Sequence, residues 1–225
     1  MMQKNNSQNK SLSNFISNIP KTPDLMTRNK YPNSAVMVLF VQKGEELFIV
    51  FEKRAENISQ GGDICFPGGS FDKDKDKTFL DTAFRETYEE IGLKKKDIKF
   101  LGQMDTFFAP IGKVLEVFVG LIDYIDYEKN LNIQTSEVAK VFLFNVDELK
   151  SKGATSYKLR IEICPSITDK DGNTKELFPI KKLNLPKHYE KPWGHNKHEV
   201  LVYEIEDEII WGLSSIVLAD ILDKY

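Results

Sequence analysis

The sequence predicts a protein of the α/β class, because it combines buried strands with an amphipathic helix. Residues 34–42, SAVMVLFVQ, form a nearly continuous apolar run, which is typical of a buried strand. A glycine-rich turn at residues 66–69, FPGG, precedes a segment with helical periodicity. In that segment apolar residues recur at the spacing of one helical face, at Leu80, Phe84, Tyr88 and Ile91. We therefore expect a helix that packs this face on the core.

The composition fits one large domain. The chain has 225 residues, of which 41% are hydrophobic, so it can bury a core. Its formal net charge of -3 is close to balance and argues against a nucleic-acid partner. The two cysteines, Cys65 and Cys164, are too few for a disulfide framework and lack the spacing of a metal site. These features predict a protein of the reducing cytoplasm.

The sequence shows neither a membrane segment nor a secretion signal. No apolar run approaches the roughly 18 residues that a membrane-spanning helix needs. The first residues, MMQKNNSQNK, also lack the apolar core of a signal peptide. We expect a cytoplasmic protein with no membrane partner.

Residues 1–30 are expected to form a tail, and residues 31–225 the folded domain. Within the tail, residues 1–10 are polar and predicted to be disordered. Apolar residues then follow the spacing of a short helix that ends at Pro20, namely Leu12, Phe15, Ile16 and Ile19. This helix would either pack on the domain or contact a second copy, and packing is the favoured interpretation. Residues 21–32 are expected to be an extended connector.

The domain is predicted to begin with a β-hairpin. Residues 34–42 and 46–53 form its strands, and residues 43–45 its turn. A loop then leads to the FPGG turn. Gly61 and Gly62 in this loop would let the backbone approach a ligand, although a plain tight turn explains them equally well.

The helix after the FPGG turn carries an unusual set of acids. Spacings of three and four residues place Glu86, Glu89 and Glu90 within about 100° of one another on its surface. Like charges so close repel, and carboxylates on one rigid face suit a hard divalent cation such as Mg²⁺ or Mn²⁺. Such a cation indicates phosphoryl chemistry. The alternative is an ordinary solvated acidic face.

Further elements follow the helix. Residues 97–108 and 114–122 are predicted strands, joined by a loop that either shapes a substrate pocket or simply turns the chain. A polar connector, 123–136, precedes a strand at 139–144 and a helical turn capped by Asn145. The last elements are strands at 157–163, 176–180 and 199–205, a turn at 169–173, an aromatic loop at 185–195 that could stack on a base, and a helix at 209–222.

The stretch from Phe66 to Leu93 resembles the Nudix box, G-x5-E-x7-R-E-U-x-E-E-x-G-U, where U is aliphatic. The matching residues are Gly69, Arg85, Glu86, Glu89, Glu90, Gly92 and Leu93. Thr87 stands where the pattern has an aliphatic residue. Fifteen residues separate Gly69 from Arg85 where the pattern has thirteen, and Asp76 is the best substitute for its first acid. The extra residues are expected to lengthen a loop, which such segments tolerate.

Residues before and after the box resemble the coenzyme A diphosphatase branch of the Nudix hydrolases. Arg54, Ala55 and Gly62 match this branch, and so does the WGL-Ser entry to the last helix, so the resemblance spans about residues 34–222. Ser59 lies near the place where the branch usually has a second arginine. The resemblance implies an α/β/α sandwich around a mixed β-sheet.

The resemblance also implies roles for individual residues. Metal ligands would be Glu86, Glu89, Glu90 and the carbonyl of Gly69, with Mg²⁺ or Mn²⁺ as the cofactor. Catalytic residues would be Glu86, Glu89, Arg85 and Glu137, with Arg85 positioning a glutamate and Glu137 serving as an extra ligand or the base. A surface glutamate is the alternative for Glu137. Substrate-binding residues would be Arg54, Gly61, Gly62 and Gly68.

The implied reaction is cleavage of coenzyme A or acyl-CoA at its diphosphate bond. The products would be a 4'-phosphopantetheine and adenosine 3',5'-bisphosphate. Two alternatives stay open, namely a different nucleoside diphosphate derivative such as ADP-ribose or NADH, and a ligand-binding regulator without hydrolysis. The expected partner is a small nucleotide-diphosphate substrate, and the expected state is a monomer or homodimer.

Overall fold

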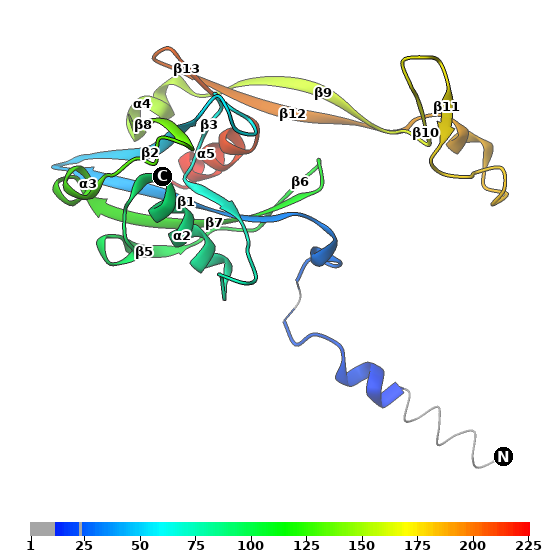
Figure 1. The fold of residues 1–225 in the computed structure, drawn as a ribbon, viewed down its shortest axis with the longest axis horizontal. Helices are drawn as coiled ribbons and strands as arrows, with labels where there is room; N and C mark the ends of the chain where they lie inside the picture. Colours follow the sequence, from blue (N-terminus) through cyan, green and yellow to red (C-terminus); the bar gives the residue numbers. More distant parts are fainter. Residues whose placement is uncertain (1–11, 23) are drawn as a thin grey trace.

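The computed structural model describes residues 12–22 and 24–225. Its centre is a mixed sheet in the order β3-β2-β1-β7-β5 (Figure 1). The bounds of these strands are Ile64–Cys65 for β3, Glu46–Arg54 for β2, Asn33–Lys43 for β1, Lys113–Asp123 for β7 and Lys99–Gln103 for β5. Strand β1 runs antiparallel to β2 and parallel to β7, so the predicted mixed sheet and its opening hairpin are confirmed.

Three further strands join this sheet at its margins. The short β4 (Gly68–Ser70) pairs with β1, and β6 (Phe107–Ala109) pairs with β7. Strand β8 (Val138–Asn145) pairs with β2. Because β4 carries the second half of the FPGG turn, this pairing fixes the turn against the central strand β1.

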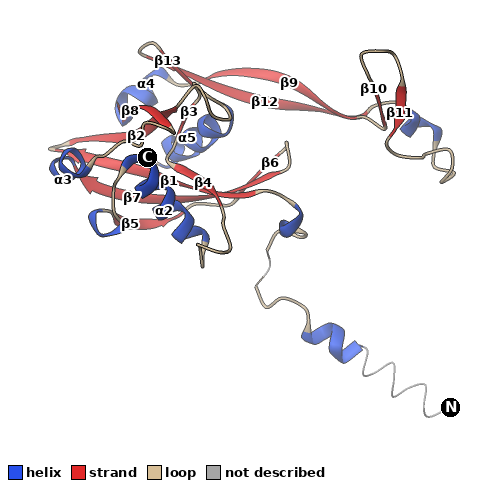
Figure 2. Cartoon of the chain, viewed as in Figure 1, coloured by secondary structure: helices blue, strands red, loops and turns tan. Residues whose placement is uncertain are grey.

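Helices cover both faces of the sheet, as expected for an α/β/α sandwich (Figure 2). Helices α2 (Phe79–Ile91) and α3 (Tyr124–Asn130) pack on one face, in an apolar cluster that includes Phe84, Ile91 and Tyr127. Helices α4 (Val146–Lys152) and α5 (Gly212–Lys224) pack on the other, in a cluster that includes Leu149 and Leu218. The two cores therefore lie on opposite sides of one sheet.

Helix α2 has well-defined ends. Thr78 caps its first turn and forms a capping box with Asp81, and Gly92 ends it in a left-handed conformation with φ of 77°. Phe84 and Ile91 are buried as predicted, but Tyr88 is 51% exposed. Thr87 is buried in place of Tyr88, because its hydroxyl donates to the Ala83 carbonyl and so needs no water.

The chain also forms a long β-ribbon that projects from the central sheet (Figure 1). Its strands are β9 (Thr155–Ile163) and β12 (Trp193–Ile205), and β13 (Glu208–Trp211) pairs with β12 near the base. The tip holds a small hairpin, β10 (Ser166–Thr168) with β11 (Thr174–Glu176), and the 3-10 turn η3 (Lys187–Glu190). We call residues 155–205 the arm.

Several predicted boundaries are wrong. The strand predicted at 97–108 is split into β5 and β6 by residues 104–106, where the exposed Thr106 donates to the buried Glu116. The connector predicted at 123–136 contains helix α3, whose first turn is capped by Asp123. By contrast, Asn145 caps α4 as predicted, accepting from the N–H groups of Asp147 and Glu148.

Two corrections fall near the C-terminus. The strand predicted at 176–180 is displaced, since β11 ends at Glu176 and pairs with β10 across the predicted turn. The helix predicted at 209–222 begins only at Gly212, because residues 208–211 pair with β12 as β13. The loop predicted at 185–195 contains η3 and enters β12 at Trp193.

The N-terminal segment contacts the domain through Arg28. Residues 12–17 are helical, but their apolar side chains are exposed, so the favoured packing of this helix on the domain is wrong. Arg28, in the 3-10 turn η1 (Arg28–Lys30), instead pairs with the buried Glu116 of β7 at 2.6 Å. The disorder predicted for residues 1–10 lies outside the described residues. Within those described, no helix is long and apolar enough to cross a membrane.

Candidate active site

The glycine turn and helix α2 meet at a very close contact. Gly69 pairs with Ala35 of β1, and its backbone lies directly under the carboxyl group of Glu86. A Cβ atom at position 69 would lie 2.4 Å from Glu86 Oε1, closer than real side chains approach. Gly68 has φ of 155°, and its Cβ would lie 2.3 Å from the Ala35 carbonyl oxygen. Both glycines are therefore required for the helix to approach the strand.

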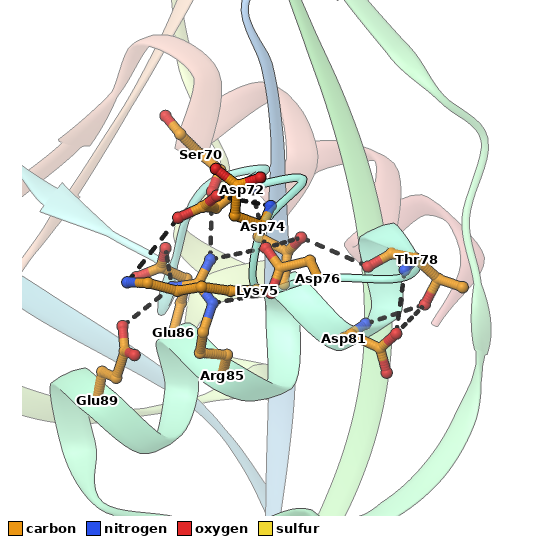
Figure 3. A network of polar contacts seen from close by, with 11 residues as sticks. Ser70, Asp72, Asp74, Lys75, Asp76, Thr78, Asp81, Arg85, Glu86 and Glu89 are labelled. Carbon is orange, nitrogen blue, oxygen red and sulfur yellow. Dashed lines mark hydrogen bonds and ion pairs between the residues drawn. The ribbon is translucent and has the colours of Figure 1, made fainter.

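Arg85 organises the polar network on α2 (Figure 3). Its Nε and Nη2 donate to the two oxygens of Asp76, each at 2.8 Å. Its Nη1 donates to Glu86 at 2.8 Å and to Glu89 at 2.9 Å. The guanidinium thereby holds the pKa of the buried Asp76 carboxyl well below its usual range. Asp76, the predicted substitute for the first acid of the box, thus anchors the arginine that positions two glutamates.

Glu90 is buried, contrary to the exposed carboxylate face that the sequence predicted. Its side chain is only 3% exposed, and its Oε2 accepts a hydrogen bond from the Gly68 N–H at 2.8 Å. Burial and the neighbouring Glu52 carboxyl raise the pKa of Glu90 to about 9. Helix α2 is oriented so that Glu90 points into the protein while Tyr88, two residues earlier, points to solvent. Glu90 therefore faces the glycine turn and not the solvent.

The other two acids of α2 differ from Glu90 in their surroundings. Glu86 is partly buried, and burial raises its pKa against the opposing effect of Arg85. Glu89 is exposed, and Arg85 is its partner on the helix. The structure thus arranges the three acids at increasing depth, from Glu89 through Glu86 to Glu90.

Glu52, on β2, is an acidic residue of the site that the sequence analysis missed. It is fully buried, and burial raises its pKa to about 7. It interacts with Glu90, and the Cys65 thiol donates to its Oε1 at 3.6 Å. The sequence could have revealed Glu52, because it lies two residues after Val50 and therefore on the same inward face of a buried strand.

Glu137 lies at the rim of the site. Its loop is tied to the end of α2, where the Gln134 N–H donates to the Glu90 carbonyl oxygen at 2.8 Å. Its own carbonyl accepts from the Ala55 N–H at 2.8 Å. The Glu137 side chain is exposed, and its charge acts on the pKa values of Glu52 and Glu86. The structure therefore places this candidate base beside the acids of α2.

Two cations also belong to this region. Arg54 ends β2, donates from Nε to the Ser59 carbonyl, and lowers the pKa of both Glu52 and Glu90 through its charge. Lys113 begins β7, and burial together with the nearby Arg54 lowers the pKa of its ammonium group. The sequence predicted only that the loop ending at Lys113 either shapes a substrate pocket or simply turns the chain, and it gave the lysine no role of its own.

Gly61 and Gly62 serve the local turn. A Cβ atom at Gly61 would lie 2.6 Å from the Glu56 carbonyl oxygen, and Gly62 has φ of 81°. The Gly62 N–H donates back to the Arg54 carbonyl at 3.0 Å, which closes the loop. These contacts account for both glycines as residues that a tight turn requires, which is one of the two alternatives that the sequence left open. The same turn positions Arg54.

The donor set fits a hard divalent cation. Glu86 and Glu90 lie beside the glycine turn, and Oε2 of the buried Glu52 has no hydrogen-bond donor among the described residues. In the described part of the chain, no group of three acidic, histidine or cysteine side chains lies close enough together to hold an ion. Figure 3 shows that Arg85 donates to one oxygen of Glu86 and to one oxygen of Glu89. Cation binding would require these carboxylates to rotate.

Within this α/β/α sandwich, the glycine turn faces a carboxylate helix whose acids are held by Arg85. A family model described as the NUDIX domain matches residues 30–161, more than half of the chain. The chain therefore belongs to the Nudix family. It is a hydrolase of a nucleoside diphosphate derivative, and hydrolases of this family generally use divalent metal ions.

Individual relatives are similar over different lengths. Nudix hydrolase 3 of Caenorhabditis elegans is 27% identical over 209 residues, which cover 90% of this chain and 78% of the relative. The peroxisomal coenzyme A diphosphatase NUDT7 of Mus musculus is 28% identical over 124 residues, which cover 54% of this chain and 49% of the relative. A solved MutT/nudix family protein from Enterococcus faecalis is 16% identical with a TM-score of 0.47, covering 95% of this chain and 69% of that one.

Proposed function

We propose that this protein hydrolyses the diphosphate bond of coenzyme A or an acyl-CoA, with Mg²⁺ or Mn²⁺ as cofactor. The products are a 4'-phosphopantetheine and adenosine 3',5'-bisphosphate. The observation that supports this best is the meeting of acids from α2 with the glycine turn and with Arg54, near which Lys113 also lies. Similarity to coenzyme A diphosphatases from mouse and from Caenorhabditis elegans supports the choice of substrate.

Each group has a distinct task in this proposal. Glu86, Glu89, Glu90 and the Gly69 carbonyl would hold the cation, which supplies charge neutralisation on the diphosphate and makes water easier to deprotonate. Arg85 positions Glu86 and Glu89 through its hydrogen bonds. Glu137, exposed at the rim, would accept the proton of the attacking water.

Cations of the protein would bind the anionic substrate. Arg54 is fixed by its hydrogen bond to the Ser59 carbonyl, so its guanidinium needs little reordering to meet a phosphate. Lys113 is half-buried, and an ammonium in that position gains from an anionic partner. Together they supply positive charge near the turn that contains Gly68, where the Gly69 amide also lies.

A broad hollow offers room for the rest of the substrate. It has a volume of about 660 Å³ and lies between the N-terminal connector and the loop before α2. Phe71 and Phe79 contribute aromatic surface to it, and Lys73 contributes positive charge, while the guanidinium of Arg28 is paired with Asp24 and Glu116. This combination suits an adenine nucleotide, since bases stack on aromatic rings and phosphates pair with cations.

Product analysis tests the proposal. The purified protein is incubated with Mg²⁺ or Mn²⁺ and, separately, with CoA, ADP-ribose, NADH and dGTP. We expect adenosine 3',5'-bisphosphate from CoA at a rate well above the others, and no product from a Glu86→Gln control. Faster cleavage of ADP-ribose or NADH would show that CoA is not the preferred substrate, while the proposed hydrolysis of a diphosphate bond would stand. No cleavage of any substrate would favour a ligand-binding regulator.

A further inference from the structure

Glu52 is buried where an acid is costly. It lies on β2 between Phe51, which packs in the core under α5, and Lys53, which pairs with Glu208 at 2.9 Å. Side chains alternate along a strand, so Glu52 points to the opposite face, toward α2. Its side chain has no exposed surface. A carboxylate taken out of water needs hydrogen-bond donors or a cation to compensate for its lost hydration.

The surroundings of Glu52 supply little compensation. Among the described residues, its Oε1 accepts from the weak S–H donor of Cys65, at 3.6 Å. Its Oε2 has no hydrogen-bond partner within the part of the chain that the structure describes. Arg54, whose charge acts on Glu52, directs its Nε to the Ser59 carbonyl instead. The protein therefore leaves one carboxylate oxygen of Glu52 unsatisfied.

The group beside Glu52 is another acid. Glu90 interacts with it, and one oxygen of Glu90 is already fixed by the Gly68 N–H at 2.8 Å. Two adjacent carboxylates cannot donate to each other, so they need either one shared proton or a cation between them. Hard divalent cations take carboxylate oxygens as their preferred ligands. The Gly68 N–H that binds Glu90 belongs to the glycine turn, whose next residue, Gly69, lies against the Glu86 carboxyl.

We propose that Glu52 is an additional ligand of the divalent cation, so that the metal site contains one carboxylate from the sheet as well as those of α2. This inference rests on the metal site of the proposed function. It explains why an acid, and not an apolar residue like those at positions 47–51 of the same strand, occupies the buried position. It also makes β2 a rigid support for the cation, since strand β2 is paired with β1 and β8 on either side.

Binding of Mn²⁺ to the purified full chain tests this role without relying on turnover. Calorimetry and the paramagnetic resonance of free Mn²⁺ give the affinity and stoichiometry for wild type and Glu52→Gln. We expect the variant to bind at least tenfold more weakly or to lose one bound ion. We also expect Mn²⁺ to raise its melting temperature less than that of wild type. Unchanged affinity, stoichiometry and melting shift in Glu52→Gln would overturn the proposal.

The substitution separates the two explanations for the acid pair. A glutamine amide can donate to Glu90 and so replaces a shared proton, but it cannot replace an anionic ligand. Glu208→Gln is the matched control, because it removes a carboxylate that pairs with the neighbouring Lys53, and it should bind Mn²⁺ like wild type. If Glu52→Gln does not fold, Glu52→Asp retracts the carboxylate by one methylene, and wild-type binding by that variant would count against the role.

The two proposals can fail separately. Absence of Mn²⁺ binding by the wild-type chain would remove the metal site of the proposed function and the role of Glu52 with it. Normal binding by wild type together with normal binding by Glu52→Gln would remove only the role of Glu52.

Discussion

The central sheet and the arm are both built from long strands, yet they bury their side chains very differently. Strand β1 is buried along nearly all of its length, between helices on both faces. Strand β9 is exposed at every residue except Ile161. The difference comes from what lies on each face, because β1 is central and covered twice while β9 is one half of a ribbon. Strand formation and burial are therefore separate properties of a sequence.

The arm is amphipathic even though the domain does not cover it. Tyr157, Leu159 and Ile163 lie on one face of β9 and are each more than half exposed. The intervening residues on the other face are charged, at Lys158, Arg160 and Glu162. An isolated two-stranded ribbon is only marginally stable in water. The arm is held at its base, where Tyr203 and Ile205 of β12 join the core under α5.

The largest expected effect is a loss of activity on substitution in the candidate active site, and it should not alter the structure of the arm. Glu86→Gln removes a carboxylate that is proposed to hold the cation, and we expect activity to fall at least about 1,000-fold, the equivalent of about 4 kcal/mol. The far-ultraviolet circular dichroism spectrum should stay unchanged. The comparison variant is Glu162→Gln on the arm, for which we expect wild-type activity. Residual activity within tenfold of wild type in Glu86→Gln would contradict the metal assignment.

Substitutions in the central sheet and in the arm should also differ clearly in their effect on the free energy of unfolding. Phe51→Ala opens a cavity among Phe66 and Phe144 in the covered sheet, and we expect a loss of about 3–5 kcal/mol in the free energy of unfolding. Leu159→Ala on the exposed face of the arm should change it by less than about 0.5 kcal/mol. Urea denaturation measures both. Equal losses would show that the arm is covered in solution.

The buried ion pair of the centre should give a pH signature that the arm lacks. Arg85 depresses the pKa of Asp76 in the folded protein, so the stabilisation is complete above the unfolded pKa near 3.8 and is lost as pH falls toward the folded value. Asp76→Asn should cost about 2 kcal/mol at pH 7, because it weakens two charge-assisted hydrogen bonds. The difference from wild type should shrink below about pH 4. A constant difference from pH 7 to pH 3 would exclude this coupling.

The smallest expected effect comes from removing the tip of the arm. Ile163 and Trp193 face each other across the ribbon, so an Asn-Gly turn can join them in place of residues 164–192. We expect hydrolysis by the shortened protein to stay within about twofold of wild type, because no residue of the candidate site lies in the tip. Steady-state kinetics on CoA and ADP-ribose provide the check. Loss of one activity alone would assign the tip to substrate recognition.

The sequence could predict those parts of the fold that depend on local chemistry. Asn145 caps its helix as expected, because capping depends on neighbouring residues only. The inward position of Glu90 could not be predicted, since it depends on how α2 rotates over the sheet, and a rotation of part of a turn exchanges Tyr88 for Thr87. Glu52 was missed for a related reason, because its neighbour Glu90 comes from a distant segment.

The contact between Gly69 and Glu86 has a genetic consequence. Codons for glycine and alanine differ by one base, so a single point mutation can place a methyl group where the Glu86 carboxyl now lies. The resulting chain would keep every acid and base of the centre and nearly the same mass and charge. A comparison that considers only the charged residues of the box would not detect such an allele. The close contact between the glycine turn and helix α2 would nevertheless be lost.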